Sequence, residues 1–540
     1  MQLKKNSSEQ KLRGAYYTPF DLAQMMVEFA TQRSFSSVLE PSCGDGVFLD
    51  CLLEQGATEK VTITAVEIEP GEAAKVSGKY EHCKSITVLC EDFFDFYKRE
   101  RDNRYDLILG NPPYIRYQYL TEKQRAIQSE ILTSHGMKAN KLINAWVAFL
   151  VACVQMLSDT GTIAFVIPAE ILQVAYAEDL RLYLANNLDS LTLVTFRQLV
   201  FADIEQEVLV FIGEKGSKNK GIRIIEMEDL EDLRSLNISE YQFREPQHVK
   251  EKWTKYFVSS DMDILQSIRN DERFIPFSDY GLINVGITTG NNKYFSIDEA
   301  TEKEYGLSEV TLPLIGRSSH AHGIYFTEDD WRQNISAGKR AMLIKFPDIP
   351  FEQYPESHLR YIRKGEENNE HTGYKCSIRD RWYIVPSVWV PDAFFLRRNN
   401  LYPKFVLNEC GAVSTDTMHR MKFNEGVIAD DVLLSYYNSI SFAFTEVCGR
   451  SYGGGVLEIL PGEMRKIMLP KISANVESEL KKELLSYIDK VVRADEDIEM
   501  ALDMVDRRLL IEKLGISEDM CRQCRAVWKK LQRRRLTRGE

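Results

Sequence analysis

The sequence predicts an α/β fold with a mostly parallel sheet, and three observations support this. Short apolar runs that read as buried strands alternate with helical patterns over the first ~200 residues. A Gly-containing loop follows the first run and precedes an apolar helix. Glu67 ends the second run and lies 21 residues after Gly46 (67 − 46 = 21), close to the ~20 residues typical of βαβ units that bind nucleotides.

Length and composition fit a globular protein of two or three domains. The chain has 540 residues, of which 44% are hydrophobic, so it can bury a sizeable core. We find no signal peptide and no apolar run long enough to span a membrane. The ten cysteines are scattered, which suits a reducing cytoplasm, and we expect the protein there. The net charge of −12 argues against non-specific coating of DNA but allows a basic cleft on an acidic body.

A helix predicted from Phe20 to Thr31 opens the first domain. Thr18 can cap this helix, and Pro19 suits its first turn. The same Tyr-Thr-Pro segment can also cover the carboxylate of a bound cofactor.

The loop at residues 41–46, Pro-Ser-Cys-Gly-Asp-Gly, joins a strand over residues 38–40 to a helix that starts at Val47. Glycines let the backbone approach a ligand closely, and the N-terminus of a helix favours an anionic group. The loop therefore predicts a nucleotide-type site at the carboxyl end of the first strand.

Acidic residues follow the next two predicted strands. Glu67 ends the strand over residues 61–66 and is placed to accept hydrogen bonds from ribose hydroxyls. Asp92 follows the strand over residues 86–89 and can accept a hydrogen bond from an adenine amino group, with Phe93 against the ring. The two acids and the glycine loop should meet at one edge of the sheet.

Residues 106–114, Asp-Leu-Ile-Leu-Gly-Asn-Pro-Pro-Tyr, are the most informative stretch. An apolar strand ends at Gly110, and two prolines cannot continue a central strand because each lacks an N–H. A rigid loop should follow at the edge where ligands of open α/β sheets bind. There the Asn111 side-chain oxygen and the Pro112 carbonyl can accept hydrogen bonds from a planar –NH2 group, and Tyr114 can stack on the attached ring.

The order of these motifs resembles that of the gamma-group adenine-N6 DNA methyltransferases, the TaqI-like enzymes of type II restriction–modification systems. The resemblance implies a Rossmann-like domain that depends on S-adenosylmethionine, with a mostly parallel seven-stranded sheet whose last strand is antiparallel. The cofactor site that it implies consists of Tyr17, Thr18, Glu40, Pro41, Cys43, Gly44, Gly46, Glu67, Ile68, Asp92, Phe93, Asn111 and Phe149. The implied catalytic residues, which hold a flipped adenine, are Asn111, Pro112, Pro113, Tyr114 and Phe201.

The second half of the chain changes character after the polar segment at residues 214–221. We expect a catalytic domain at residues 1–220, a linker region at 221–244, a mixed α+β target-recognition domain at 245–472 and a helical C-terminal segment with a basic tail at 473–540. The candidates for contact with DNA are Arg116, Tyr117, Arg317, Lys404, Arg450 and Tyr452. No metal site is expected, since Cys521 and Cys524 have no second Cys or His pair nearby.

The expected function is transfer of a methyl group to the N6 amino group of adenine in double-stranded DNA, which would protect the DNA from a separately encoded restriction endonuclease. Three alternatives stay open: a cytosine-N4 methyltransferase, a methyltransferase acting on a protein glutamine, and a non-catalytic DNA-recognition subunit of a defence system. NAD is less suitable as cofactor because the full Gly-x-Gly-x-x-Gly spacing is missing. With both domains on one chain, we expect a monomer. A fused nuclease is not expected, because only about 13 residues precede the first methyltransferase motif and no convincing nuclease carboxylate cluster follows.

Overall fold

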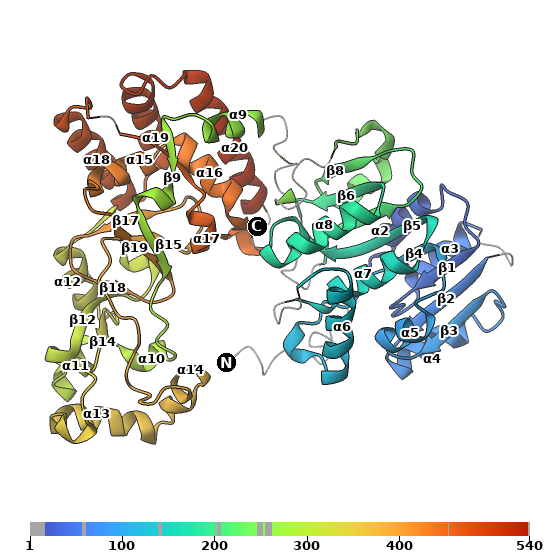
Figure 1. The fold of residues 1–540 in the computed structure, drawn as a ribbon, viewed down its shortest axis with the longest axis horizontal. Helices are drawn as coiled ribbons and strands as arrows, with labels where there is room; N and C mark the ends of the chain where they lie inside the picture. The colour runs from blue at the N-terminus through green and yellow to red at the C-terminus, as the bar shows by residue number, and fades with distance from the viewer. Residues whose placement is uncertain are drawn as a thin grey trace. The chain divides into compact units, whose positions relative to one another are not determined.

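The computed structural model describes residues 17–56, 61–138, 143–198, 200–201, 207–245, 252–253, 257, 262–451, 453–472 and 474–537. It divides into two compact units, Met1–Phe257 (unit 1) and Val258–Glu540 (unit 2). We describe each unit by itself (Figure 1).

Unit 1 is built on one eight-stranded sheet with the strand order β3-β2-β1-β4-β5-β7-β6-β8. The strands are β1 (Ser37–Glu40), β2 (Thr62–Glu67), β3 (Ile86–Cys90), β4 (Tyr105–Gly110), β5 (Leu157–Pro168), β6 (Ser190–Phe196), β7 (Val208–Glu214) and β8 (Gly221–Met227). The first five strands in the order are parallel, whereas β7 runs antiparallel to both of its neighbours. The carboxyl ends of β1 to β4 therefore share one edge, as the sequence predicted.

Strand β8 corrects two expectations. It adds an eighth strand to the expected seven and pairs in parallel with β6 over Gly221–Met227, the start of the expected linker. The polar Gly/Ser/Lys segment before it is a turn between β7 and β8, not a domain boundary. Nearly all of β8 is buried, so its Gly-Ile-Arg-Ile-Ile run reads as a sheet strand once the turn is recognised.

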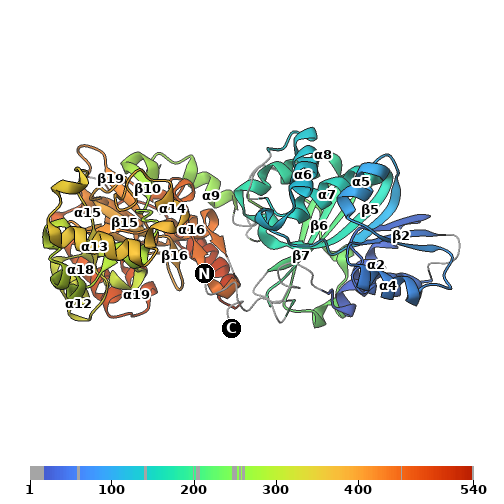
Figure 2. The same cartoon turned by 90° about the horizontal axis from the view of Figure 1, so that it is seen from below.

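Helices cover both faces of this sheet, which makes unit 1 a three-layer structure (Figure 2). One face carries α2 (Phe20–Ala30), α3 (Val47–Glu54) and α4 (Pro70–Lys79), whose apolar residues share one core. The other face carries α5 (Phe93–Glu100), α6 (Glu122–Ser134), α7 (Ala145–Met156) and α8 (Glu178–Asn187), which share a second core. Helix α7 is apolar on all sides and buried along almost its whole length, so it forms the centre of that second core.

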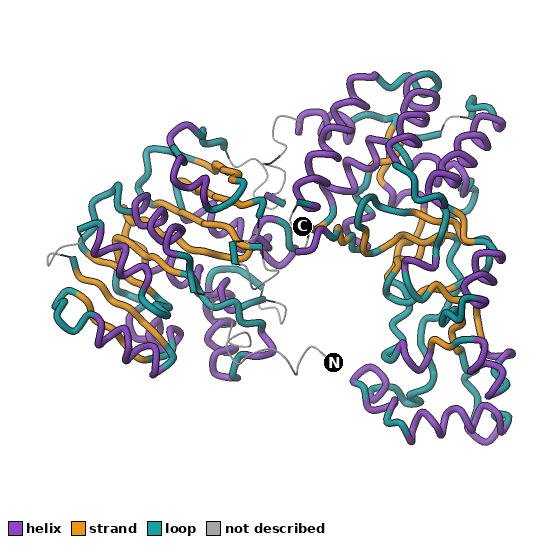
Figure 3. Tube along the Cα trace, turned by 180° about the vertical axis from the view of Figure 1, so that it is seen from behind, coloured by secondary structure: helices purple, strands orange, loops and turns teal. Residues whose placement is uncertain are grey.

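Unit 2 is a mixed α+β unit with several small sheets (Figure 3). Its largest sheet has the order β10-β19-β15-β17-β13, from strands β10 (Gly281–Val285), β13 (Tyr325–Phe326), β15 (Ala393–Leu396), β17 (Phe405–Asn408) and β19 (Met418–Phe423). The C-terminal helices α18 (Ser478–Arg493), α19 (Ile498–Val505) and α20 (Glu518–Leu536) pack into the same core as this sheet and α16 (Ser439–Cys448). The helical prediction for this part holds, but the helices belong to unit 2 and are not a separate segment.

The described residues contain neither a candidate membrane span nor a cluster of metal ligands. No described helix is long and apolar enough to cross a membrane. No group of three or more His, Cys, Asp or Glu side chains among the described residues is arranged to hold a metal ion. Cys521 and Cys524 are both buried on α20 within the helical core.

Candidate functional site

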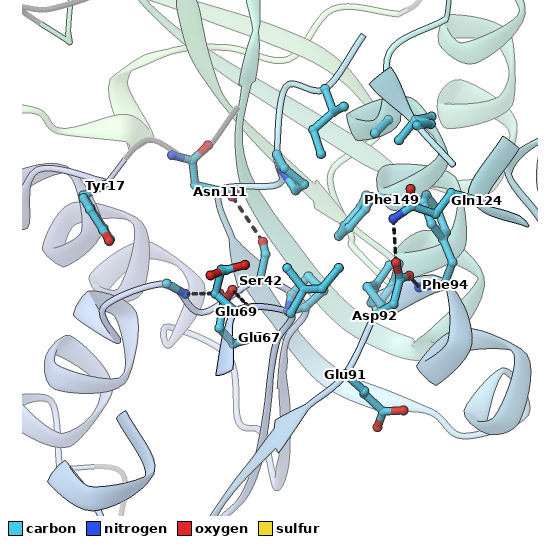
Figure 4. Close-up of a pocket in the computed structure, with 18 residues that line it drawn as sticks. Tyr17, Ser42, Glu67, Glu69, Glu91, Asp92, Phe94, Asn111, Gln124 and Phe149 are labelled. Atoms are coloured by element: carbon cyan, nitrogen blue, oxygen red, sulfur yellow. Dashed lines mark hydrogen bonds between the residues drawn. The ribbon is translucent and has the colours of Figure 1, made fainter. Parts of the chain in front are cut away.

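A pocket of about 330 Å³ lies at the shared carboxyl edge of the first four strands of unit 1 (Figure 4). It falls in the size range of small-molecule sites, which begins at about 300 Å³. The lining residues are Tyr17, Pro41, Ser42, Gly44, Glu67, Ile68, Glu69, Glu91, Asp92, Phe93, Phe94, Asn111, Pro113, Ile115, Leu120, Gln124, Ala145 and Phe149. Most of the cofactor residues that the sequence predicted are thus brought together in one cavity.

The glycine loop is held against the end of β2 by Glu67. The Glu67 carboxylate accepts hydrogen bonds from the backbone N–H of Gly44 and of Glu69, each over 2.9 Å. Gly44 and Gly46 have φ values of 52° and 83°, which side chains other than glycine rarely adopt. A carboxylate has about four lone-pair sites, so Glu67 keeps the capacity to accept from two further donors.

The far side of the pocket combines an acid with an aromatic wall. Asp92 caps α5, and its Oδ1 accepts from the Phe94 N–H over 2.7 Å. The rings of Phe93 and Phe149 stack with their centroids 4.4 Å apart, and both rings are buried. An acceptor beside a flat apolar surface suits a heteroaromatic ring that carries an amino group.

The Asn-Pro-Pro-Tyr loop closes the pocket after β4. The Asn111 Nδ2 donates to the Thr18 hydroxyl over 3.2 Å, and the Asn111 carbonyl accepts from the Ser42 hydroxyl over 3.1 Å. The expected capping of α2 by Thr18 is wrong, because Pro19 takes the N-cap position and no side chain caps this helix. Thr18 is not among the lining residues of the pocket, and its expected contact with a cofactor stays a prediction. Thr18 instead orients the side-chain amide of Asn111. Because the amide nitrogen faces Thr18, the amide oxygen of the same planar group points away from Thr18.

The other predicted catalytic residues lie close to this loop. The Tyr114 hydroxyl donates to the Val166 carbonyl of β5 over 3.1 Å, which ties the loop to the sheet. Phe201 is 8% exposed and belongs to the apolar core against which Tyr114 packs. Pro113 lines the pocket, whereas Pro112, Tyr114 and Phe201 do not. The structure therefore groups these residues beside the cofactor-type cavity without placing all of them in its wall.

Three further predicted residues, Glu40 before the glycine loop and Cys43 and Gly46 within it, do not line the pocket. Glu40 ends β1, is 1% exposed and has no hydrogen-bond partner among the described residues on either carboxylate oxygen. Burial raises the pKa of Glu40 well above its usual range, and the charges of Asp45 and Glu67 add to this. Burial also raises the pKa of the Cys43 thiol, so this cysteine is an inert core residue.

The predicted DNA contacts divide into exposed and internal residues. Arg116 and Arg317 are exposed, and the ring of Tyr117 lies 5.1 Å from the Arg125 guanidinium. Lys404 donates to the Ala321 carbonyl over 3.2 Å, and burial lowers its pKa. Arg450 forms a largely buried ion pair with Glu463 at 2.6 Å. Lys404 and Arg450 thus have internal partners, which argues against phosphate contact.

The remaining predictions for the C-terminal half concern Tyr452 and the basic tail. Tyr452 lies outside the described residues. The expected basic tail is in part internal, because Arg534 and Arg535 on α20 are 9% and 1% exposed. Arg535 pairs with the buried Glu446 at 2.9 Å, so this arginine stabilises the core of unit 2 and does not face solvent.

The sequence reading missed several lining residues. Those not predicted are Ser42, Glu69, Glu91, Phe94, Ile115, Leu120, Gln124 and Ala145. Some signals were present: Ile115 directly follows the Asn-Pro-Pro-Tyr loop, and Thr121 with Gln124 matches the capping-box pattern. That pattern predicts where α6 begins, but it does not show which other side chain Gln124 reaches.

The chain is similar to DNA methyltransferases along most of its length. A family model described as "Type II methyltransferase M.Eco57I, C-terminal domain" matches residues 250–510. Type II methyltransferase M.AccI of Acinetobacter calcoaceticus is 24% identical over 478 residues, which cover 84% of each chain. Type II methyltransferase M.HincII of Haemophilus influenzae is 30% identical over 234 residues, which cover 42% of this chain and 43% of the relative.

Solved structures share the fold. The Type IIL restriction-modification enzyme MmeI in complex with DNA has a TM-score of 0.56 at 12% identity, covering 95% of this chain and 75% of that chain. The DrdV–DNA complex has a TM-score of 0.52 at 13% identity, covering 90% of this chain and 58% of that chain. The family model described as "N-6 DNA Methylase" matches residues 1–282, which is more than half of the 540 residues. The protein therefore belongs to the N-6 DNA methylase family.

Proposed function

We propose that the protein transfers a methyl group from S-adenosylmethionine to the N6 amino group of a flipped adenine in double-stranded DNA, at a specific site. One observation carries the proposal: Asn111 and Pro113 of the Asn-Pro-Pro-Tyr loop close the same pocket that Glu67 and Asp92 line. A donor for methyl transfer and the amine that receives the methyl group can thus meet in one place.

The pocket residues fit S-adenosylmethionine. Glu67 retains acceptor capacity for ribose hydroxyls, Asp92 can accept from the adenine amino group, and Phe93 with Phe149 offers an apolar face for the adenine ring. Gly44 keeps the loop free of a side chain where it lines the pocket. When bound, this cofactor supplies an electrophilic methyl group on a sulfonium.

The residues of the chain then act by positioning and electrostatics. The Asn111 side-chain oxygen and the Pro112 carbonyl accept hydrogen bonds from the target –NH2 group, which concentrates the lone pair on nitrogen. Thr18 fixes the Asn111 amide for this purpose through the 3.2 Å hydrogen bond. Tyr114 stacks on the base, and Phe201 supports it from the neighbouring core. No covalent nucleophile is needed.

We further propose that unit 2 is the target-recognition unit. Its match to the C-terminal domain of M.Eco57I supports this role. Arg317, which is exposed on unit 2, and Arg116 on the segment after the catalytic loop can neutralise phosphates. The methylated DNA would be that of the host cell, acted on in the cytoplasm and protected from a separate cognate endonuclease.

The deciding experiment uses labelled S-adenosylmethionine and unmethylated genomic DNA, followed by nucleoside analysis. We expect the label in N6-methyladenine, and sequencing would then map the site. Label in N4-methylcytosine would keep the mechanism and change the target base. Label in added protein, or no transfer despite cofactor binding, would contradict the proposal and favour amide methylation or a non-catalytic subunit.

A further inference from the structure

Gln124 on α6 contacts the carboxylate that the proposed function assigns to the cofactor adenine. Its Nε2 donates to Asp92 Oδ2 over 2.6 Å, and both side chains line the pocket (Figure 4). The other oxygen, Asp92 Oδ1, accepts from the Phe94 N–H over 2.7 Å. The Asp92 carboxylate is therefore held at both oxygens, once by its own helix and once by α6.

The other end of the Gln124 amide is engaged in the N-terminal cap of α6. Gln124 Oε1 accepts from the Thr121 N–H over 2.9 Å and from the Thr121 hydroxyl over 3.0 Å. The Thr121 hydroxyl in turn accepts from the Gln124 N–H over 3.2 Å, which completes a capping box. A backbone N–H can only donate and a carboxylate can only accept, so both neighbours require the amide nitrogen to face Asp92.

The segment that carries Gln124 also follows the catalytic loop. Ile115 and Leu120 of this segment line the same pocket. The segment that follows the catalytic loop therefore contributes apolar contacts from Ile115 and Leu120, and its helix α6 contributes the Gln124 amide beside Asp92.

We propose that Gln124 is a positioning residue for the cofactor adenine. It holds the Asp92 carboxylate in the orientation that receives the adenine amino group, and it thereby makes recognition of that group depend on α6. The inference rests on the proposed function, because it takes S-adenosylmethionine as the ligand of the pocket.

A purely structural role can be separated from this one, because the same two helices have a second link. Lys123 donates to Asp95 over 2.6 Å, also from α6 to α5, but neither residue lines the pocket and Lys123 is 68% exposed. If Gln124 only joined the helices, loss of either link would affect cofactor binding in the same way.

The test is calorimetric binding of S-adenosylhomocysteine and of its analogue with purine in place of adenine, which lacks the 6-amino group. A hydrogen bond to a charged group is worth about a ten- to hundredfold preference, so the unchanged protein should favour the adenine compound by about that ratio. In Gln124→Ala, and in Gln124→Glu, which keeps an acceptor for the cap but has no N–H, the preference should fall to within about threefold. Lys123→Ala should keep the original preference.

Steady-state kinetics supply a second readout. Gln124→Ala should raise KM for S-adenosylmethionine by about tenfold and leave kcat within about twofold, because the adenine is remote from the reacting methyl group. An unchanged preference for the 6-amino group in Gln124→Ala would overturn the inference, even if overall affinity falls. If the unchanged protein bound no S-adenosylhomocysteine, the proposed function would fail first and the inference with it.

Discussion

The two units differ in how their carboxylates are paired. In unit 2, two buried carboxylates each pair with an arginine: Glu446 with Arg535 at 2.9 Å, and Glu463 with Arg450 at 2.6 Å. At the pocket edge of unit 1, the carboxylates of Glu40, Glu67 and Asp92 form no ion pair with any cation among the described residues. Among the same residues, Glu67 and Asp92 accept from neutral N–H groups, and Glu40 accepts from none.

This difference shows which charges serve the fold and which can serve a ligand. In a buried ion pair each charge neutralises the other, so neither group attracts a third group strongly. A carboxylate that accepts only from a few neutral donors keeps spare lone pairs for further donors. A ligand rich in N–H, O–H and positive charge, such as S-adenosylmethionine, is suited to the second kind of site.

The largest effect should come from breaking a buried ion pair in unit 2. Arg535→Met would leave the Glu446 carboxylate buried without its partner, which should lower the free energy of unfolding by about 3–5 kcal/mol. Denaturant titration measures this, and binding of S-adenosylhomocysteine by unit 1 should stay unchanged. The matched control is the double variant Arg535→Met, Glu446→Leu, which should recover much of the loss; no recovery would show that the charge pair is not the cause.

The next effect concerns chemistry and leaves stability nearly unchanged. Asn111→Ala removes the amide oxygen proposed to accept from the target amine, and kcat should fall by about 10²–10³-fold, as on loss of one oriented polar group in an active site. Thermal melting should change little, because Asn111 is half-buried and the hydrogen bond from its side-chain amide to Thr18 joins two neutral groups. Methylation of DNA at the original rate would show that Asn111 is not catalytic.

A smaller effect should appear at Glu40, whose buried carboxyl group has no hydrogen-bond partner among the described residues. Since burial raises the pKa of Glu40, its contribution to stability is greatest below its usual pKa of 4.5 and is lost as pH rises towards the folded value. Glu40→Gln has no charge to bury, so without ligand its Tm should exceed that of the unchanged protein at pH 8, and the difference should shrink towards pH 4. Scanning calorimetry at several pH values measures this. A difference that does not vary with pH would mean that the pKa of Glu40 is not raised in the folded protein.

The smallest effect should be at the exposed cations. Arg317→Ala should weaken DNA binding similarly for all sequences and reduce the slope of log K against log salt by about 1. Lys404→Ala and Arg450→Ala serve as comparisons, because their side chains have internal partners and should affect melting more than the salt slope. A change of slope in either of these two, but not in Arg317→Ala, would reverse our division of exposed and internal residues.

The sequence predicted the sheet edge well because its signals are local. Strand ends at Glu40, Glu67 and Gly110 and the positive-φ glycines are read from apolar runs, turn residues and spacing. These signals need no knowledge of distant residues, and the pocket lies at the sheet edge where the strand ends come together.

What the sequence did not predict depends on contacts between distant residues. Thr18 contacts Asn111 across 93 positions, and Gln124 contacts Asp92 across 32. Arg535 is internal only because Glu446, 89 residues away, is buried beside it. A run of arginines at the end of a chain looks the same whether it faces solvent or a buried carboxylate, so composition alone favoured the wrong answer for that residue.

The three tethers of the Asn-Pro-Pro-Tyr loop have a consequence for the DNA. Ser42, Thr18 and the Val166 carbonyl hold the loop to three different segments before any base arrives. A loop fixed in this way loses little entropy on binding. Most of the free-energy cost of flipping the base is then the cost of opening the duplex. A target adenine opposite a mismatched base, which is already weakly paired, should then bind more tightly than one in a perfect duplex, and the gain should reflect the strength of the lost base pair.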